Sequence, residues 1–178
     1  MCRGITKSGN PCKHSSQTLT TQFCVIHKPR GEHIPNFVIE YPGCHYVNGG
    51  LMTKAMTQKR PSVNFSHLML DIPDNSRIVL VMIDPDAPTS KINGNQYLHW
   101  LVTNIEECDV SNAKDIYPYQ GPNPPPNSGV HRYQFYVLSQ PGPITVSNTL
   151  ERKDFNYHDF ISKYGLEEVD RAFFTVSS

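Results

Sequence analysis

A short apolar run, Ile78–Asp84 (IVLVMID), is the segment that most constrains the fold of this chain. It is rich in β-branched side chains and shorter than an ordinary helix, so it predicts a strand that is buried on both faces. The residues that follow, Asp84–Pro88 (DPDAP), include two prolines. Prolines fix φ and cannot donate to a β-ladder, so the strand has to end here.

Three more segments have strand character, and proline and glycine turns separate them: Tyr97–Ile105 (YLHWLVTNI), His131–Gln140 (HRYQFYVLSQ) and Ala172–Val176 (AFFTV). Helical segments do not alternate regularly with these strands. That order favours an antiparallel β-sandwich with a few short helices over a doubly wound α/β fold. We expect Ile78–Asp84, Tyr97–Ile105 and His131–Gln140 to be neighbouring central strands.

The clearest helix covers Tyr157–Tyr164. Its apolar side chains recur at i, i+3, i+4 and i+7 and form one stripe. Asn156 precedes the helix as a suitable N-cap, and Gly165 follows it as a suitable C-terminal cap.

Composition limits the class of protein. A chain of 178 residues fits one domain, with at most a small appendage. Lys and Arg number 16, as do Asp and Glu, which argues against a protein that binds nucleic acid non-specifically. No apolar run is long enough to span a membrane, and the first residues do not resemble a secretory signal. The five cysteines are then expected to be reduced or metal-bound, in the cytoplasm.

Three polar segments are candidates for chemistry, and each has an ordinary structural explanation as well. Asp84–Pro88 forms a stiff acidic corner, or merely ends a strand. His99 lies in an apolar strand, where a histidine is usually a satisfied core residue. The loop before His131 (YQGPNPPPNSGV) can offer backbone N–H groups to an anion, or it is a surface loop without a ligand. Taken together, the three segments suggest a small anion pocket.

The order of these motifs is specific. DPDAP, then LHW followed by LVTN, then GPNPPPNSGVHRY resembles the phosphatidylethanolamine-binding protein (Raf kinase inhibitor protein-like) family. The resemblance runs from about Gly49 to the end of the chain and includes the segment FNYHDFISKYGL. It implies a β-sandwich with a shallow pocket for phosphorylated head groups or other small anions, and a partner such as a kinase or another regulatory protein.

The resemblance also implies which residues form the pocket: Asp84, His99, Gly121, Pro124, Pro125, His131 and Tyr133. We expect His131 and the loop to donate to the anion, and Asp84 to orient a histidine. The tight corner and the resemblance together predict a cis peptide bond between Ala87 and Pro88.

The first 30 residues differ in composition from the rest, so we divide the chain into a small element at 1–30 and a main domain at 31–178. The element contains Cys2, Cys12, Cys24 and His27, a ligand set that suits tetrahedral zinc. It resembles a Cys3His element appended to proteins of large DNA viruses, which implies a viral protein in the host cytoplasm or the virion. The alternative is a disordered tail with unligated thiols. A segment this short has no core of its own, so its order would depend on the metal.

Three functions are compatible with these features. The first is a non-enzymatic binding protein that holds phospho-ligands and regulates a protein partner. The second is a hydrolase that uses Asp84, His99 and His131, although GxSxG and glutamate–histidine metal motifs are missing. The third is an interaction protein with a vestigial pocket that docks through its zinc element.

Overall fold

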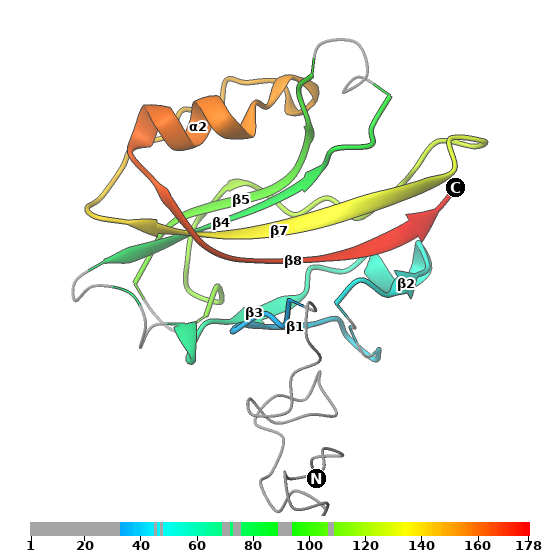
Figure 1. The fold of residues 1–178 in the computed structure, drawn as a ribbon, viewed down its shortest axis with the longest axis horizontal. Coiled ribbons are helices and arrows are strands. Elements are labelled where there is room, and N and C mark those ends of the chain that lie inside the picture. Colours follow the sequence, from blue (N-terminus) through cyan, green and yellow to red (C-terminus); the bar gives the residue numbers. More distant parts are fainter. Residues whose placement is uncertain are drawn as a thin grey trace, which may run out of the picture.

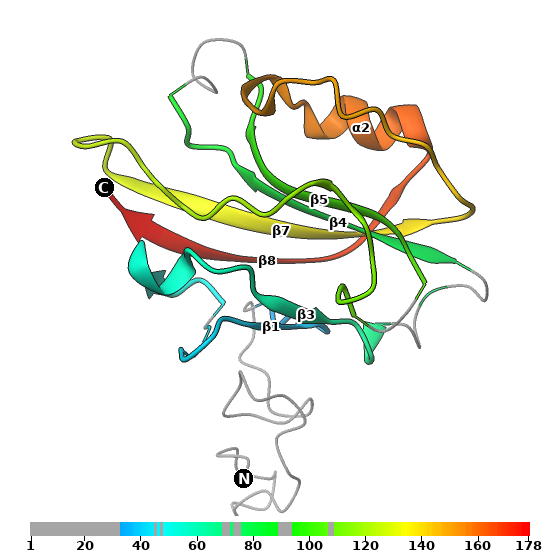
Figure 2. The ribbon, with the colours of Figure 1, turned by 180° about the vertical axis from the view of Figure 1, so that it is seen from behind.

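The computed structural model describes residues 33–178, apart from positions 45, 47, 69–71, 73–75, 89–93 and 107–108. In these ranges strands dominate, with a single α-helix (Figures 1 and 2). The strands are β1 (Val38–Glu40), β2 (Leu51–Met52), β3 (Ser62–Asn64), β4 (Arg77–Asp84), β5 (Tyr97–Ile105), β6 (Asp115–Tyr117), β7 (Val130–Gln140) and β8 (Glu167–Ser177). The helices are α2 (Tyr157–Tyr164) and the 3-10 turns η2 (Ala55–Thr57) and η4 (Arg152–Asp154).

Six of the strands form one sheet in the order β2-β8-β7-β4-β5-β6. Neighbours are antiparallel, except that β2 runs parallel to β8. Strand β4 lies between β5 and β7, so the three predicted central strands are indeed neighbours. The short strands β1 and β3 form a separate two-stranded antiparallel sheet.

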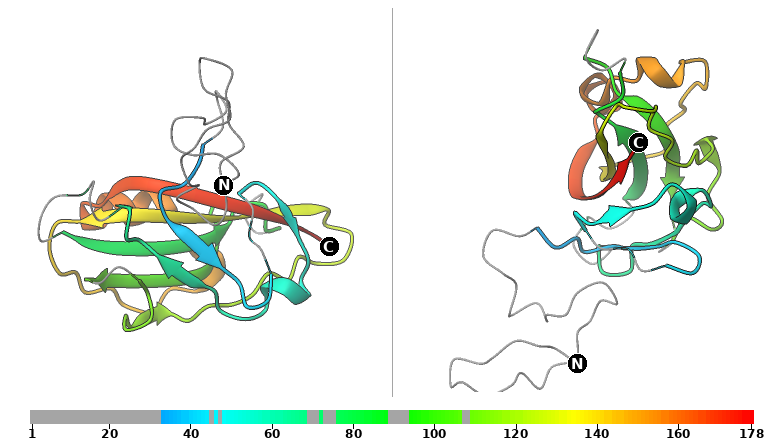
Figure 3. Two further views of the ribbon diagram at one scale, coloured as in Figure 1. Left: turned by 90° about the horizontal axis from the view of Figure 1, so that it is seen from below. Right: turned by 90° about the vertical axis from the view of Figure 1, so that its right-hand side faces the viewer.

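The large sheet has a core on each face. On one face, Leu80, Trp100 and Phe135 are fully buried against the layer that contains β1 and β3. On the other, Val81 and Leu138 pack beneath helix α2. The right-hand view in Figure 3 shows this arrangement, with the β1–β3 layer below the sheet and α2 above it. The mainly β, sandwich-like fold that the sequence predicted is therefore confirmed.

Helix α2 has the predicted bounds and caps. The side chain of Asn156 accepts a hydrogen bond from the N–H of Asp159. Gly165 has φ of 60°, a left-handed conformation that glycine adopts without strain. Its N–H donates to the carbonyl of Ile161 and so ends the helix.

The prediction of a cis bond between Ala87 and Pro88 is wrong, because no peptide bond in the described residues is cis. The corner is turned by a side chain instead: Oδ1 of Asp84 accepts the N–H of Asp86 at 2.8 Å. This local hydrogen bond reverses the chain with trans prolines, which are the more stable isomer by about 0.5–1 kcal/mol.

Within the described ranges, no helix is both long enough and apolar enough to cross a membrane. The predicted element at 1–30 lies outside the described residues, so its boundary with the main domain stays a prediction.

Candidate functional site

The end of β4 and the start of β7 bring the predicted site residues together. The two strands are antiparallel, so Asp84 at the last position of β4 lies near His131 and Tyr133 on β7. Strand β5, on the other side of β4, places His99 in a T-shaped contact with the ring of Tyr133 at 5.1 Å. Four predicted residues from three strands therefore meet at one end of the sheet.

Asp84 and His131 form a buried pair. Oδ2 of Asp84 lies 2.7 Å from Nδ1 of His131, and the residues are 4% and 1% exposed. Burial raises the pKa of Asp84, and the hydrogen bond from His131 opposes that rise. The short distance fixes the orientation of the imidazole ring, as predicted for Asp84.

Ser128 completes this arrangement. Its hydroxyl donates to the carbonyl of Pro125 at 2.6 Å, which uses its only hydrogen. The same oxygen lies 2.9 Å from Nε2 of His131, so Nε2 must carry the hydrogen of that bond. Both ring nitrogens of His131 are thus engaged, and the ring can donate to a ligand only if Ser128 moves.

His99 is a neutral acceptor. Its Nδ1 lies 2.7 Å from the carbonyl oxygen of Gln120, which can only accept, so Nδ1 is protonated. Burial lowers the pKa of His99 to about 4, so near neutral pH the ring carries a single hydrogen. Nε2 is then left with a lone pair, which can accept a hydrogen bond from a protonated ligand oxygen.

Tyr133 contributes an unsatisfied donor. The residue is fully buried, and its hydroxyl forms no hydrogen bond of standard geometry with the described residues, although Asp84 and the backbone of Asn123 are close enough to interact with it. Burial raises the pKa of Tyr133, and the negative charge of Asp84 raises it further, so the phenol stays protonated. A buried hydroxyl without a partner typically costs about 1–3 kcal/mol, and such groups often mark binding sites.

The proline-rich loop is held from beneath by the segment around η2. The side chain of Gln58 donates to the carbonyl of Pro122 at 2.8 Å, and that of Lys54 donates to the carbonyl of Pro124 at 2.9 Å. Gly121 is required by this contact, because a Cβ there would meet the carbonyl oxygen of Thr57 at 2.8 Å. Gly121 therefore packs the loop against η2.

The loop prolines differ in exposure: Pro124 is buried and Pro125 is exposed. Pro125 reaches the site through its carbonyl, which Ser128 holds. The predicted residues thus divide into two groups, with Asp84, His99, His131 and Tyr133 forming the site and the loop residues shaping its edge.

An ion pair that the sequence analysis did not anticipate lies beside the site. Arg132 contacts Asp86 through Nε and through its second guanidinium nitrogen, both at 2.8 Å, and its backbone N–H also donates to Asp86. The Arg132 guanidinium holds the pKa of Asp86 below its usual range. The sequence feature that could have indicated this ion pair is Asp86, the second carboxylate of DPDAP. Ser128, in contrast, had no recognisable motif.

The predicted zinc ligands Cys2, Cys12, Cys24 and His27 lie outside the described residues. Within the described ranges, no group of three or more histidine, cysteine or acidic side chains is arranged to hold a metal ion.

Comparison with known proteins agrees with this geometry. Residues 31–173 match the sequence profile of the family described as phosphatidylethanolamine-binding protein. Protein FLOWERING LOCUS T of Arabidopsis thaliana is 32% identical over 130 residues, which are 72% of this chain and 71% of that protein. The 26 kDa secreted antigen of Toxocara canis is 33% identical over 66% of this chain, and the match spans 46% of the antigen. These relatives come from a plant and a nematode, and the viral origin expected from the sequence finds no support in them.

A solved structure shows the same fold. The carboxypeptidase Y inhibitor, crystallised with its cognate proteinase, superposes with a TM-score of 0.65 and 22% sequence identity. The superposition covers 81% of this chain and 83% of the inhibitor.

Proposed function

This chain belongs to the phosphatidylethanolamine-binding protein family, and we propose that it is a non-enzymatic binding protein whose pocket holds the phosphate of a phosphorylated head group or a related phospho-ligand. The observation that carries the proposal is the Tyr133 hydroxyl, which is fully buried and without a partner among the described residues. It lies beside His99, which can accept, and His131, which can donate. A phosphate presents both acceptor oxygens and, when protonated, a donor.

Ser128 mimics the ligand in this proposal. Its oxygen, 2.9 Å from Nε2 of His131, occupies a position that a phosphate oxygen would take. Binding would displace the Ser128 hydroxyl from Nε2 of His131 and put an anionic acceptor in its place, which forms the stronger hydrogen bond. The loop would then cover His131 until an anionic ligand displaces the Ser128 hydroxyl.

The site favours a singly protonated phosphate. Because His99 stays neutral, its Nε2 accepts best from a P–OH group, which a phosphate monoester has below its second pKa of about 6. Affinity should therefore be higher near pH 6, where about half of a phosphate monoester carries that proton, than near pH 8, where only about 1% does.

The row Ser128–His131–Asp84 has the connectivity of a hydrolase triad, yet a nucleophilic serine is the weaker interpretation. In a triad, the serine donates its hydrogen to the histidine. Here that hydrogen goes to the carbonyl of Pro125 at 2.6 Å, and His131 is the donor to Ser128. We therefore expect neither hydrolysis of activated esters nor labelling of Ser128 by a fluorophosphonate.

A protein partner is the second part of the proposal. The inhibitor in the structural comparison is seen with its cognate proteinase, which supports partner binding by this fold. A regulatory role for this chain would then couple the phospho-ligand to a partner such as a kinase.

Titration by NMR tests the pocket directly. Phosphorylethanolamine and inorganic phosphate should give saturable shifts at Tyr133, His99 and the loop, whereas ethanolamine, which lacks the phosphate, should give none. A nucleoside monophosphate tests whether the pocket accepts a larger phospho-ligand. Shifts with ethanolamine at Tyr133, His99 or the loop, or no shifts there with any phosphate compound at the lower pH, would contradict the proposal.

A further inference from the structure

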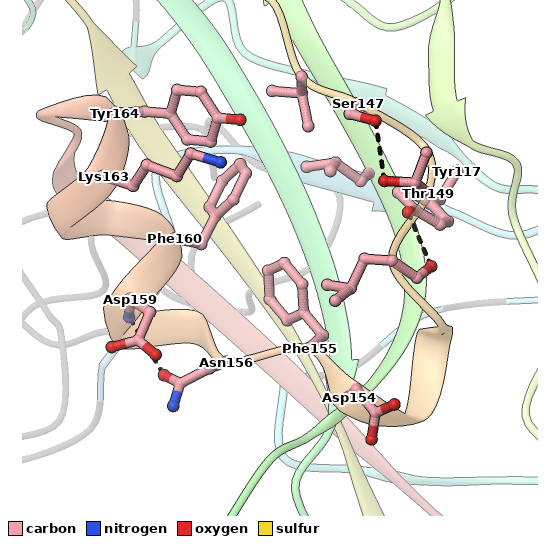
Figure 4. Close-up of a pocket in the computed structure, with 13 residues that line it drawn as sticks. Tyr117, Ser147, Thr149, Asp154, Phe155, Asn156, Asp159, Phe160, Lys163 and Tyr164 are labelled. Carbon is pink, nitrogen blue, oxygen red and sulfur yellow. Dashed lines mark hydrogen bonds between the residues drawn. The ribbon is translucent and has the colours of Figure 1, made fainter.

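A cavity lies on the face of the six-stranded sheet opposite the candidate site, beneath helix α2 (Figure 4). It has a volume of about 390 Å³, within the range of roughly 300–1,000 Å³ that is usual for small-molecule sites. Leu101 of β5 and Phe155 lie among its apolar lining residues. The Asp84–His131 pair belongs to the other face of the sheet, so the two sites are separate.

Aromatic rings line the helix side of the cavity. Phe155 and Phe160 have ring centroids 5.3 Å apart, and Phe160 and Tyr164 are 5.1 Å apart. Nζ of Lys163 lies 5.1 Å from the centre of the Tyr164 ring. The face of an aromatic ring attracts ammonium ions, and in this cavity the ammonium group of Lys163 already lies over such a ring.

Acidic side chains outnumber basic ones around the opening. Asp154 and Asp159 are both lining residues, and Lys163 is the cation among them. In the part of the chain that the structure describes, none of these three side chains forms an ion pair. Figure 4 shows Asp154 and Asp159 along one edge of the opening and Lys163 with Tyr164 above them. The cavity therefore presents a net negative charge over an apolar, aromatic floor.

The remaining side of the opening is apolar and held in place. Leu150 lines it and is 44% exposed, although it is a large hydrophobic residue. The hydroxyl of Tyr117 donates to the carbonyl of Leu150 at 2.8 Å and fixes this segment against the sheet. An exposed leucine on a fixed segment favours a ligand with an apolar body.

We propose that this cavity binds an organic ammonium ion, that is, a primary amine attached to an alkyl or aryl body. The body lies on Phe155, Phe160 and Leu150. The ammonium group lies at the edge formed by Asp154 and Asp159, away from Lys163, and the two carboxylates stabilise it. An organic carboxylate of the same shape would be attracted by Lys163 but repelled by the two carboxylates of Asp154 and Asp159.

Three probes with the same phenyl body separate the alternatives in the full chain: phenethylamine, phenethyl alcohol and hydrocinnamate. NMR titration should show shifts in α2 and in residues 146–156, with affinity highest for the amine and lowest for the carboxylate. Equal affinity for the amine and the alcohol would mean a purely apolar cleft. Preference for the carboxylate, or the absence of saturable shifts, would overturn the proposal.

Matched variants test the charges. Lys163→Gln removes the competing ammonium and should raise amine affinity about fivefold, the effect of one unit charge in a largely aqueous setting. Asp159→Asn should lower it by a similar factor. Lys59→Gln and Glu167→Gln, at exposed positions outside the cavity, are the controls and should change nothing. Loss of amine affinity in Lys163→Gln would contradict the assignment.

Phosphate titration of each variant should be unchanged, which separates this site from the anion pocket.

Discussion

Ser128 Oγ lies 2.9 Å from Nε2 of His131, so a loop hydroxyl covers the ring nitrogen that the proposed pocket would offer to a ligand. Asp84 holds the opposite side of that ring at 2.7 Å, and His131 is 1% exposed. The ring therefore links the end of strand β4 to the proline-rich loop. Ligand affinity and loop position should accordingly be coupled.

Replacing Ser128 by alanine tests that coupling. The variant loses the bond from His131, which is worth about 1 kcal/mol, and leaves Nε2 open to the ligand. Affinity for inorganic phosphate should rise about fivefold, measured by calorimetry. Ser62→Ala, at an exposed position of β3, is the control and should leave affinity unchanged. A lower affinity in Ser128→Ala would instead make Ser128 a direct ligand contact.

Tyr133→Phe should separate stability from binding. Removing a buried hydroxyl that has no partner among the described residues should raise the free energy of unfolding by about 1–2 kcal/mol. Phosphate affinity should fall by roughly 10- to 100-fold, because a hydrogen bond to a charged group contributes about 1.5–3 kcal/mol. Urea unfolding and phosphate titration give the two values.

Tyr46→Phe is the matched control for that variant. The hydroxyl of Tyr46 donates toward Asn48 Oδ1 at 3.2 Å and toward the carbonyl of Phe173 at 3.1 Å, so its removal should lower stability without changing phosphate affinity. If Tyr133→Phe also lost stability, its hydroxyl would have a partner in solution.

His99 should make the fold sensitive to acid. Its pKa is lowered from 6.5 to about 4 in the folded state, so the unfolded chain takes up a proton that the folded protein refuses. This contribution to stability is present above pH 6.5 and is lost as the pH falls to about 4, by about 3 kcal/mol in total. His99→Asn keeps a donor for the Gln120 carbonyl but cannot titrate, so its free energy of unfolding should depend less on pH over that interval. The exposed His158, replaced in the same way, should leave the profile unchanged.

Zinc at the N-terminal element remains a prediction from sequence. Elemental analysis of the purified full chain should find roughly one equivalent of zinc, the number that one tetrahedral site holds. Cys12→Ser should reduce it. Cys44→Ser, a free thiol of the main domain, should not. Metal-free protein, or the same zinc content in Cys12→Ser, would favour an unligated tail.

Strong patterns predicted the centre of the fold. The short, β-branched run of β4, the strand-like segments of β5 and β7, and the i, i+3, i+4, i+7 stripe of α2 each indicate one type of secondary structure. Strand β8 was predicted only over Ala172–Val176, whereas it begins at Glu167. Its first half is acidic, which is typical of a loop, but pairing with Leu138 and Ser139 of β7 makes it a strand. The short strands β1, β3 and β6 show no recognisable sequence pattern. They are strands because they form hydrogen bonds with neighbouring strands.

The residues of the candidate site were predicted from sequence motifs. The contacts that were not predicted depend on which residues the fold brings close together. Nothing in a lone loop serine indicates that Ser128 will cover a histidine. The cis bond was inferred from the tightness of the corner and from the family resemblance, yet the Asp84 side chain turns the chain with trans bonds. Gly121 was expected to line the pocket. In the structure, its lack of a Cβ allows the loop to approach the backbone of Thr57.

Strand β8 has a consequence for how the protein is made. It lies between β2 and β7, with Thr175 opposite Leu51 and Val176 opposite His131. Because the ribosome synthesises the chain from its N-terminus, β7 and the pocket emerge well before the strand that covers their edge. Until residues 167–177 are released, β7 presents unpaired N–H and C=O groups to solvent, and exposed edges of this kind recruit other strands. Nascent chains stalled before Glu167 should therefore depend on chaperones, and the full-length chain should be freed from them in a single late step.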